Sequence, residues 1–588
     1  MGGRSLKLFV ASMMVLALVT SACASKKAAA PGSTGTVDTN GGIVYSLDQE
    51  PTNFNVLTSD GNEFDMQAII GRMWPTVFNV DANAKPFLDT TLMDSVTLTS
   101  TSPQVVVYQI NHKAVWQDGV PFNADDFVYN WQAQSGLPQY TDVGGVAFDA
   151  ASNAGYRQIK EITYSPDKYT VTATYSTPFA DWRSLFGPMA PAHVMSKIGW
   201  NKGLLAANVN KDTMISAGPF MFSSYTAGKD FILKRNPTYW GTPSNLATVD
   251  FRFITDSSQV EPALANNEIN ASYPQPQLDL VNQLKTVPNV KLDERPGLAY
   301  EHLDFNQSNP FLADVNLRKA IAMAIDRNDL IAKTVGQFAT GIVPDNNHIY
   351  VPGQPEYRDN SAGPVTGTGT ATATATASAT PSASAGPYDK ANVDGAKALL
   401  TSNGYSISGN PPVLKNKAGK AVTLRIASTQ GNKLRNSEEA YVINALAPLG
   451  ITVTEKDTTG LGKTLSSQDF DMIIFAWIDT PYPSGNDPIF QTQVKDKTGT
   501  VTAGGQNYDS YSNPAVDALI KQADVELDHN KQADLYNQVD ALLWKDMITL
   551  PLFQKPTLLV YQTKYKNLVN NITQVGPSFN MDQWALTR

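Results

Sequence analysis

The stretch Val105–Gln132 reads VVVYQINHKAVWQDGVPFNADDFVYNWQ. It opens on β-branched and aromatic residues, a composition that favours a strand. The dipeptide Asp118-Gly119 is typical of a tight turn. Asn123 then predicts the start of a helix, because its side chain can cap the helix while Asp125 and Asp126 place negative charge in the first turn. The stretch therefore predicts a strand, a turn and a helix in close succession.

Both kinds of pattern recur along the chain. The run 170–175, TVTATY, alternates strictly and suits a half-buried strand, and 249–254 is a second β-rich run. Apolar residues recur at helical spacing over 315–331, behind the capping residue Asp314, and again over 535–547. The mixture predicts an α/β or α+β body.

Five passages carry a family resemblance. The stretch 105–132 resembles the "strand, Trp/Phe-x-Asp-Gly-x-Pro-Phe-x-Ala-x-Asp-Val" passage of bacterial family 5 extracellular solute-binding proteins, the dipeptide and oligopeptide type. Four similar passages follow in the family's order: GPF at 218–220 with KRNPTYW at 234–240; LDFN at 303–306 with NPF at 309–311, LRKAI at 317–321 and AIDR at 324–327; FDM at 470–472 with Ala476-Trp477; and NY at 507–508 with YSNP at 511–514 and VD at 516–517. The resemblance covers essentially residues 43–588.

The resemblance implies an α/β, two-lobed fold of the type II periplasmic-binding-protein kind, with an extra subdomain and a hinged cleft. We expect the segments in this order: lobe I from 43–75 and 215–296, the extra subdomain from 76–214, lobe II from 297–550, and a return to lobe I over 551–588. It also implies a monomer that encloses its ligand between the lobes and delivers it to the transmembrane subunits of an ABC permease.

Residues 361–387 form a low-complexity tract of Thr, Ala, Ser, Pro and Gly. Such a composition has little to bury and predicts disorder. A domain linker is the alternative to a surface loop. We favour an insertion in lobe II, because Tyr388-Asp389 and Ala398-Leu399-Leu400 continue the family pattern directly after it.

The N-terminus indicates export. Arg4 and Lys7 precede an apolar run, Leu8 to Val19, which is too short to span a membrane and typical of a signal peptide. Cys23 stands where a lipobox places the acylated cysteine, although Thr20 occupies a position where that pattern usually has Leu. We therefore expect a signal peptide over 1–22, a lipid anchor to the membrane at Cys23, and a flexible tether over 23–42. An ordinary signal peptide with an incidental cysteine is the alternative.

Composition excludes several function classes. One cysteine in 588 residues rules out an internal disulfide and a cysteine-rich metal site. The net charge of −9 argues against a nucleic-acid partner, which would require a clustered basic face. The chain has five histidines and neither an HExxH nor a GxSxG motif. We therefore expect no catalytic residues, no metal site and no cofactor, and the resemblance implies a binding protein in place of an enzyme.

The resemblance also directs attention to a ligand site. Family members that bind peptides meet the α-ammonium with a carboxylate shortly after the strand that contains Ala476-Trp477 here. Asp479 is therefore our first choice, although it follows Trp477 by two residues where the family more often has three. Asp487 is a rival, because the loop that leads to it is lengthened.

Three other residues are candidates for the pocket. Trp477 is a possible aromatic wall, Asn306 follows a strand-like segment, and Trp74 lies in GRMWPTVF. The leading hypothesis is a peptide-binding lipoprotein of an ABC importer. Alternatives are the same fold binding chelated nickel, haem, an oligosaccharide or an opine, a lipoprotein with a sensing role, and a secreted hydrolase.

Overall fold

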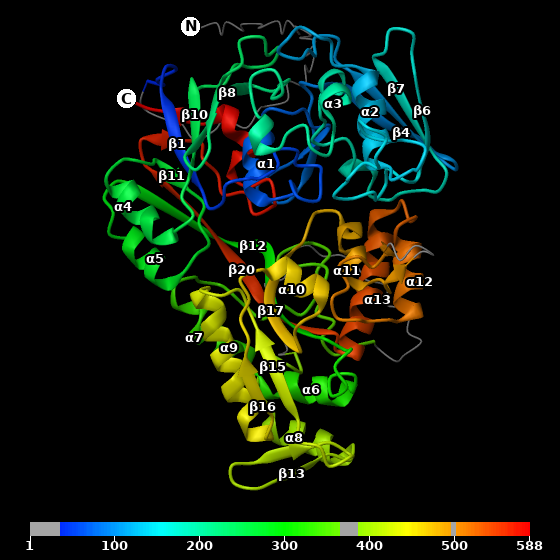
Figure 1. Cartoon of the computed structure of the whole chain (residues 1–588), viewed down its shortest axis with the longest axis vertical. Coiled ribbons are helices and arrows are strands. Elements are labelled where there is room, and N and C mark those ends of the chain that lie inside the picture. Colours follow the sequence, from blue (N-terminus) through cyan, green and yellow to red (C-terminus); the bar gives the residue numbers. More distant parts are fainter. Residues whose placement is uncertain (1–35, 365–385, 496–500) are drawn as a thin grey trace, which may run out of the picture.

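The computed structural model describes residues 36–364, 386–495 and 501–588. Cys23 and the predicted signal peptide lie outside these residues. Within the described ranges, no helix combines the length and the apolar character that crossing a membrane requires. The described chain is an α/β protein with two lobes, one above the other in Figure 1. The predicted fold class is confirmed.

The stretch that opens the sequence argument folds as predicted. β5 (Gln104–Ile110) is followed by a turn and by α2 (Ala124–Gln134). The Asn123 side chain accepts a hydrogen bond from the first turn of α2 at 2.8 Å, while the Asp126 carboxylate accepts from the Asn123 backbone at 3.1 Å. Trp116 is fully buried and donates its Nε1 hydrogen to Asp126. This reciprocal cap fixes where the helix begins.

The strand of this stretch belongs to a separate four-stranded antiparallel sheet in the upper lobe. Its order is β4 (Met93–Thr101), β5, β7 (Thr170–Tyr175), β6 (Ile159–Tyr164). Val171, Ala173 and Tyr175 of β7 are buried and alternate with half-buried residues, which confirms the predicted alternation. This sheet, with α2 and α3 (Ala192–Ile198), lies at the upper right of Figure 1.

A ten-stranded sheet runs through both lobes. In order its strands are β16 (Thr452–Glu455), β15 (Thr423–Ala427), β17 (Met472–Ile478), β12 (Val290–Phe305), β20 (Thr549–Gln562), β11 (Ala271–Ser272), β1 (Gly42–Leu47), β10 (Thr248–Phe253), β9 (Asp230–Arg235) and β8 (Phe220–Thr226). The first three strands belong to the lower lobe and the last five to the upper lobe, while β12 and β20 are shared (Figure 1).

The shared strands β12 and β20 are the crossover between the lobes. They pair antiparallel over most of their lengths, but the register shifts between Pro296 and Tyr300. Pro296 lies opposite Pro556 at this point. Because proline has no backbone N–H, neither residue can donate to the ladder. The interruption between the two halves of the ladder gives the molecule a place to hinge.

Helices cover the sheet and build the lower lobe. In chain order they are α1 (Phe64–Ile70), α4 (Val260–Ala265), α5 (Leu278–Leu284), α6 (Val315–Ala324), α7 (Arg327–Lys333), α8 (Val393–Ser402), α9 (Lys433–Leu446), α10 (Leu461–Ser467), α11 (Asp487–Phe490), α12 (Pro514–Ala523) and α13 (His529–Asp546). The predicted helical pattern at 535–547 lies in α13 up to Asp546, and Met547 is the residue that ends the helix, in the left-handed conformation. The last three helices lie directly below the four-stranded sheet in Figure 1.

The single helix predicted over 315–331 is wrong. Asp314 caps α6 as expected, by accepting from the Asn316 backbone at 2.9 Å. Ile325 then takes an extended backbone conformation, and Asp326 caps α7 by accepting from the Asp329 backbone at 2.9 Å. A second capping residue thus ends one helix and starts the next without changing the apolar spacing.

The two lobes have separate cores, with one departure from the expected segments. Buried side chains of α4 and α5, such as Leu264 and Leu280, belong to the same apolar cluster as Leu303 and Leu330 of the lower lobe. The expected segment 215–296 places both helices in lobe I. The segment boundaries stay predictions.

The two ends of the low-complexity tract lie together in the lower lobe. A Cβ placed on Gly386 would lie 2.7 Å from Ser361 Oγ, and the Gly386 backbone donates to Asp389 at 2.6 Å. Asp389 in turn pairs with the buried Arg327 at 2.8 Å. Residues 365–385 lie outside the described ranges. The adjacency of the flanks favours the interpretation of the tract as an insertion over that of a linker.

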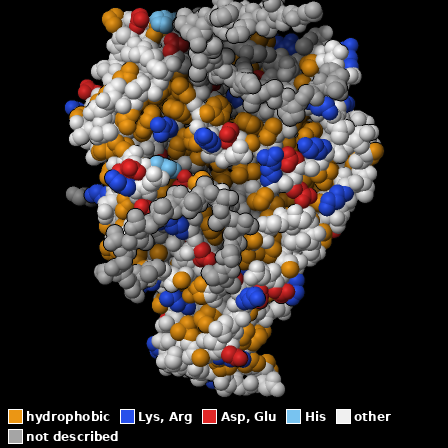
Figure 2. Space-filling view, turned by 180° about the vertical axis from the view of Figure 1, so that it is seen from behind, with side chains coloured by type: hydrophobic (Ala, Val, Ile, Leu, Met, Phe, Trp, Pro, Cys, Tyr) orange, Lys and Arg blue, Asp and Glu red, His pale blue; other side chains and the backbone are white. Residues whose placement is uncertain are grey.

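The surface contains charges of both signs. On the face shown in Figure 2, Lys and Arg side chains are scattered among acidic and uncharged ones. Nucleic-acid binding uses a clustered basic stripe or patch. This face has no such cluster among its described residues.

Candidate ligand-binding cleft

One cavity has walls from both lobes. Its volume is about 200 Å³. The upper lobe contributes residues from 67–80, 184–188 and 573–575, and the lower lobe contributes 479–482. Ligand sites in two-lobed proteins form where the lobes close on each other. This cavity is therefore the candidate ligand-binding cleft.

Asp479 reaches the cavity because it extends β17. β17 pairs antiparallel with β12 through Ile478 opposite Ala299, and the Asp479 backbone N–H adds one more bond to the Leu298 carbonyl at 3.0 Å. The side chain is 1% exposed, so the end of the strand holds a carboxyl group in a nearly closed environment.

The Asp479 carboxyl group is only half satisfied. Its Oδ1 accepts a hydrogen bond from Asn486 Nδ2 at 3.2 Å. Its Oδ2 is buried without a hydrogen-bond partner among the described residues. A buried polar atom without a partner costs free energy, and in native proteins such an atom is often matched by a ligand, water or ion. The geometry leaves one acceptor position open beside the cavity.

The surroundings of Asp479 disfavour the charged form of its carboxyl group. Burial raises the pKa of its carboxyl group well above the usual range, the nearby Asp345 and Asp540 raise it further, and the Asn486 hydrogen bond offsets only part of this effect. None of the described residues that line the cavity is Lys, Arg or His. A cationic group that entered the cavity would meet this carboxyl group and, among the described lining residues, no like charge.

Asp487 does not line this cavity. It begins α11, and its Oδ1 accepts a hydrogen bond from Tyr536 Oη at 2.8 Å. The same hydroxyl group lies 3.3 Å from Asp524 Oδ1. Burial, followed by the neighbouring Asp524 carboxylate, raises the pKa of Asp487 well above its usual range. The structure places this residue in the helical group α11–α13, away from the cavity wall.

Trp477 lies on β17, two residues before Asp479, but it is not on the cavity wall. Its ring stacks on His302 and Tyr508, with centroids 6.0 Å apart in each case. Phe475 meets it edge-on at 5.0 Å. The tryptophan is part of an aromatic stack under the cleft.

Asn306 and Trp74 have structural contacts. The Asn306 amide donates to the carbonyls of Gln468 and Phe470, and its oxygen accepts from Ser308, so it closes the turn after β12. Trp74 is 2% exposed and donates its Nε1 hydrogen to the Ile215 carbonyl. Neither side chain lines the cavity between the lobes. That these two residues contact the ligand stays a prediction, and the contacts described here give them structural partners instead.

Two other cavities lie within single lobes. One, of about 30 Å³, lies beside Trp74 in the upper lobe and has room for about one water molecule. The other, of about 280 Å³, lies between Lys319, Lys545 and Trp544 in the lower lobe. Neither has walls from both lobes.

The described residues form no cluster of three or more His, Cys, Asp or Glu side chains that could hold a metal ion. His302 and His348 are fully buried in the lower lobe, where their Nδ1 atoms contact Asp304 at 2.8 Å and Asp540 at 2.6 Å. Each of these imidazole rings is therefore held by a buried aspartate within the structure.

Sequence reasoning missed Asn486 and the upper-lobe walls. Asn486 lies in the loop whose extra length is evident from the sequence, but its contact with Asp479 depends on how that loop folds back. The upper-lobe walls come from segments more than 100 residues away from Asp479 along the chain, at 67–80 and 184–188. No local pattern signals such an approach.

Comparisons with known proteins give a consistent picture. A family model described as "Bacterial extracellular solute-binding proteins, family 5 Middle" matches residues 88–498. The chain is 29% identical to the oligopeptide-binding protein OppA of Mycobacterium tuberculosis over 541 residues, which cover 90% of this chain and 83% of that protein.

Solved structures show the same fold. A periplasmic EDTA-binding protein, EppA, superposes with a TM-score of 0.83 at 28% identity, covering 94% of this chain and 98% of the other. The oligopeptide-binding protein AppA of Bacillus subtilis, in complex with a nonapeptide, superposes with a TM-score of 0.72 at 20% identity, covering 94% and 100%.

Proposed function

Because the chain belongs to the bacterial extracellular solute-binding proteins of family 5, which bind a solute for ABC transport and are not enzymes, we propose that its solute is a peptide. Asp479 holds the terminal ammonium group of that peptide in the cleft between the lobes. The observation that carries the proposal is the buried Asp479 Oδ2, which has no partner among the described residues beside the interlobe cavity.

An ammonium group matches what this cavity offers. It would donate to the free oxygen, favour the charged form of the carboxyl group, and form a charge-assisted bond shielded from water. Such a charge pair recognises the terminal ammonium group of the peptide and is independent of the peptide's side chains. Extended backbone at the end of β17 also suits a ligand that pairs like an added strand.

The relatives differ in what they bind. OppA and AppA are named for oligopeptides, while EppA is named for EDTA, a polyanion. A polyanion would favour basic side chains, and none occurs among the described cavity-lining residues. The cavity of this chain therefore favours the peptide proposal over a chelator. Chelated nickel, haem, oligosaccharides and opines are alternatives that ligand identification decides.

The anchor is tested by titration calorimetry with matched peptides. Peptides with a free amine bind wild type, and Asp479→Asn weakens them more than about tenfold, or ~1.4 kcal/mol. N-acetylated versions bind poorly to both proteins. Asp487→Asn, at the start of α11 directly after this loop, is the matched control, and it retains wild-type affinity. Equal affinity of wild type and Asp479→Asn for free-amine peptides overturns the assignment to Asp479.

We further propose that Cys23 carries the lipid anchor and that the protein acts as a monomer beside its permease. Cys23 is the single cysteine of the chain, at the end of a signal-like segment. An anchor of this kind keeps a released ligand close to the membrane transporter.

The division of the chain into lobe I, extra subdomain and lobe II belongs to the same proposal. If the gene lies away from permease and ATPase genes, a sensing role becomes the better explanation.

A further inference from the structure

The two lobes touch beside the cavity through a small polar contact. In the upper lobe it involves residues 180–184, which include the 3₁₀ turn Trp182–Ser184. In the lower lobe it involves the 3₁₀ turn Pro483–Asn486 and the helices α12 and α13. Ser184 and Tyr482, one from each side of the contact, also line the cavity. The contact and the candidate ligand site are therefore neighbours.

Asp181 is the centre of this contact. Its Oδ2 accepts hydrogen bonds from the Ser484 backbone N–H at 3.0 Å and from Ser484 Oγ at 2.6 Å. Its Oδ1 accepts from Gln532 Nε2 at 3.0 Å. The side chain is 6% exposed, and it makes no capping bond to the 3₁₀ turn that follows it. All three hydrogen bonds come from the other lobe.

Two further bonds tie the same segments together. Tyr482 Oη donates to the Arg183 carbonyl at 3.2 Å, and the Ala180 backbone donates to the Asp524 carbonyl at 2.8 Å. A buried carboxylate stabilises a structure only where donors replace its water shell. Asp181 has those donors when the lobes are together, and it must exchange them for water when the lobes separate.

The lower-lobe turn links this contact to the ligand site. Ser484 receives Asp181, and Asn486, two residues later in the same turn, donates to Asp479 Oδ1 at 3.2 Å. Thr480 Oγ donates to the Tyr482 carbonyl at 2.7 Å and accepts from the Tyr482 backbone at 3.1 Å. Residues 479–486 therefore form one hydrogen-bonded loop with a ligand-facing end and a lobe-facing end.

We propose that Asp181 and Asn486 are positioning residues for ligand capture: Asp181 latches the loop 479–486 to the upper lobe when the cleft closes, and Asn486 orients the Asp479 carboxyl group within that loop. The second half of this inference rests on the proposed function of Asp479. The first half requires only that the protein opens and closes.

The two residues have separable effects. Asp181→Asn keeps the size of the side chain but turns an amide N–H toward one of the three donors, so the latch weakens. We expect ligand release to become about tenfold faster, because the closed state loses a hydrogen bond to a charged group. The preference for free-amine over acetylated peptides stays the same. Asn486→Ala lowers that preference, because the Asp479 carboxyl group loses its fixed orientation.

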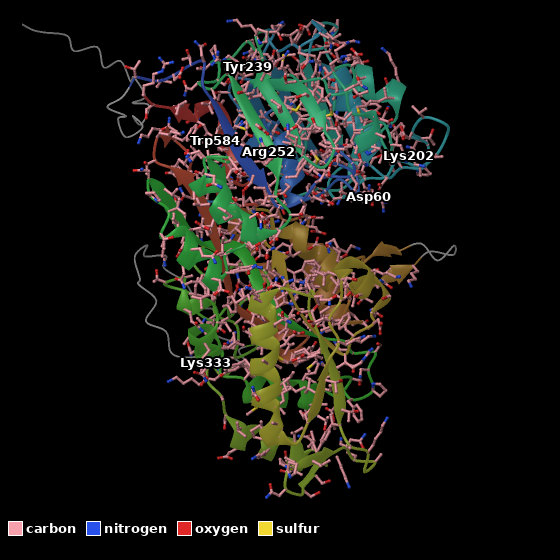
Figure 3. The ribbon with its side chains drawn as sticks, turned by 60° about the vertical axis from the view of Figure 1, so that its left-hand side comes forward. Asp60, Lys202, Tyr239, Arg252, Lys333 and Trp584 are labelled. Carbon is pink, nitrogen blue, oxygen red and sulfur yellow. The ribbon has the colours of Figure 1, made fainter. Side chains whose placement is uncertain are left out.

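Lobe motion is measured without any ligand by single-molecule energy transfer. Dyes on Lys202→Cys and Lys333→Cys, in the full chain with Cys23→Ser, report the separation of the lobes; Lys202 lies on the upper lobe and Lys333 on the lower lobe (Figure 3). Asp181→Asn shifts the empty protein toward low transfer. Ser484→Ala, a milder change, shifts it less, and the double variant Asp181→Asn/Ser484→Ala adds little to Asp181→Asn because both changes act on one contact. Asp212→Asn, on the exposed surface, is the matched control and leaves the transfer unchanged.

The outcomes distinguish the two proposals. If wild type binds no peptide but Asp181→Asn still opens the lobes, the peptide proposal fails and the latch stands. If wild type binds peptide and neither Asp181→Asn nor Ser484→Ala changes the transfer or the release rate, the latch is overturned. An unchanged preference for free amines in Asn486→Ala overturns the role of Asn486.

Discussion

At the scale of single residues, the main feature of the cleft is the buried carboxyl group of Asp479, which has a hydrogen-bond partner among the described residues on only one of its two oxygen atoms. Asp479 has one weak partner, Asn486, and acidic neighbours in Asp345 and Asp540. The unfolded chain would solvate this carboxyl group. Holding it in the cleft therefore costs stability, and we propose that this cost serves the binding of a cation.

The stability of Asp479→Asn should depend on pH. Because its carboxyl pKa is raised in the folded protein, the folded state holds a proton that the unfolded state loses above pH ~4. Stability is lost as pH rises from there through the raised pKa, and Asn escapes this loss. Ligand-free Asp479→Asn should melt at a higher temperature than ligand-free wild type at pH 8, by about 1 °C for each ~1 kcal/mol relieved in a chain of this length, with the difference shrinking toward pH 4. Scanning calorimetry of both proteins, with Asp212→Asn as control, measures it; a lower melting temperature for Asp479→Asn at pH 8 contradicts the account.

Residue identity could be predicted from the sequence better than side-chain direction. Asp479 was expected at the cleft because it follows a recognisable strand. Asn306 and Trp74 were also candidates for the cleft. Their side chains instead donate hydrogen bonds to the Phe470 and Ile215 carbonyls within the protein. Asp181 meets Ser484 across 303 residues of sequence, and no local pattern specifies such a pair.

At the scale of elements, a buried charge cluster ties a helix of the lower lobe to the two crossover strands. Glu301 on β12 contacts Arg435 on α9 at 3.2 Å and Lys555 on β20 at 2.8 Å. The three side chains are buried, so each cation depends on the carboxylate. The cluster holds α9 against both crossover strands, close to the interrupted register at Pro296.

Glu301→Gln tests this cluster. Burial alone would raise the pKa of Glu301, but Arg435 and Lys555 outweigh it and lower the pKa to about 2. This contribution to stability is present above the unfolded pKa of ~4.3 and is lost as pH falls toward 2. Urea unfolding should show a loss of ~3–5 kcal/mol for Glu301→Gln at pH 7 and a smaller one at pH 3. The exposed Glu161→Gln serves as control, and an equal loss at both pH values counts against the ionic cluster.

Most helices and strands could be predicted because the signals that specify them are local, and the predictions were wrong where a signal was overlooked or not local. The caps at Asn123 and Asp314 and the alternation of β7 act within a few residues, so sequence suffices for them. The break at Ile325 was missed because apolar spacing continues through it, while the local cap at Asp326 decides the outcome. The placement of α4 and α5 on the lower-lobe core depends on tertiary packing.

At the scale of the whole molecule, two lobes joined by two strands can open and close while each keeps its own core. The proline pair in the crossover strands weakens the ladder between the lobes, and the Asp181 contact ties the two lobes together beside the cavity. A ligand that touches both walls stabilises the closed form by mass action.

One prediction concerns membrane attachment at Cys23, which lies outside the described residues. Cys23→Ser should move the protein from the membrane fraction to the medium or periplasm, because a thioether-linked lipid is its only proposed anchor. Detergent phase partitioning of wild type and variant measures this. A Cys23→Ser protein that still partitions with detergent contradicts lipidation at this position.

The central claim is that the cleft captures peptides through a terminal ammonium group at Asp479. Native mass spectrometry of the protein purified from rich medium, before and after mild unfolding, tests it most directly. We predict added mass on the folded protein that is released as peptides with free N-termini, and that is absent from Asp479→Asn. Release of a chelate, haem or sugar from the wild-type protein instead would contradict the claim.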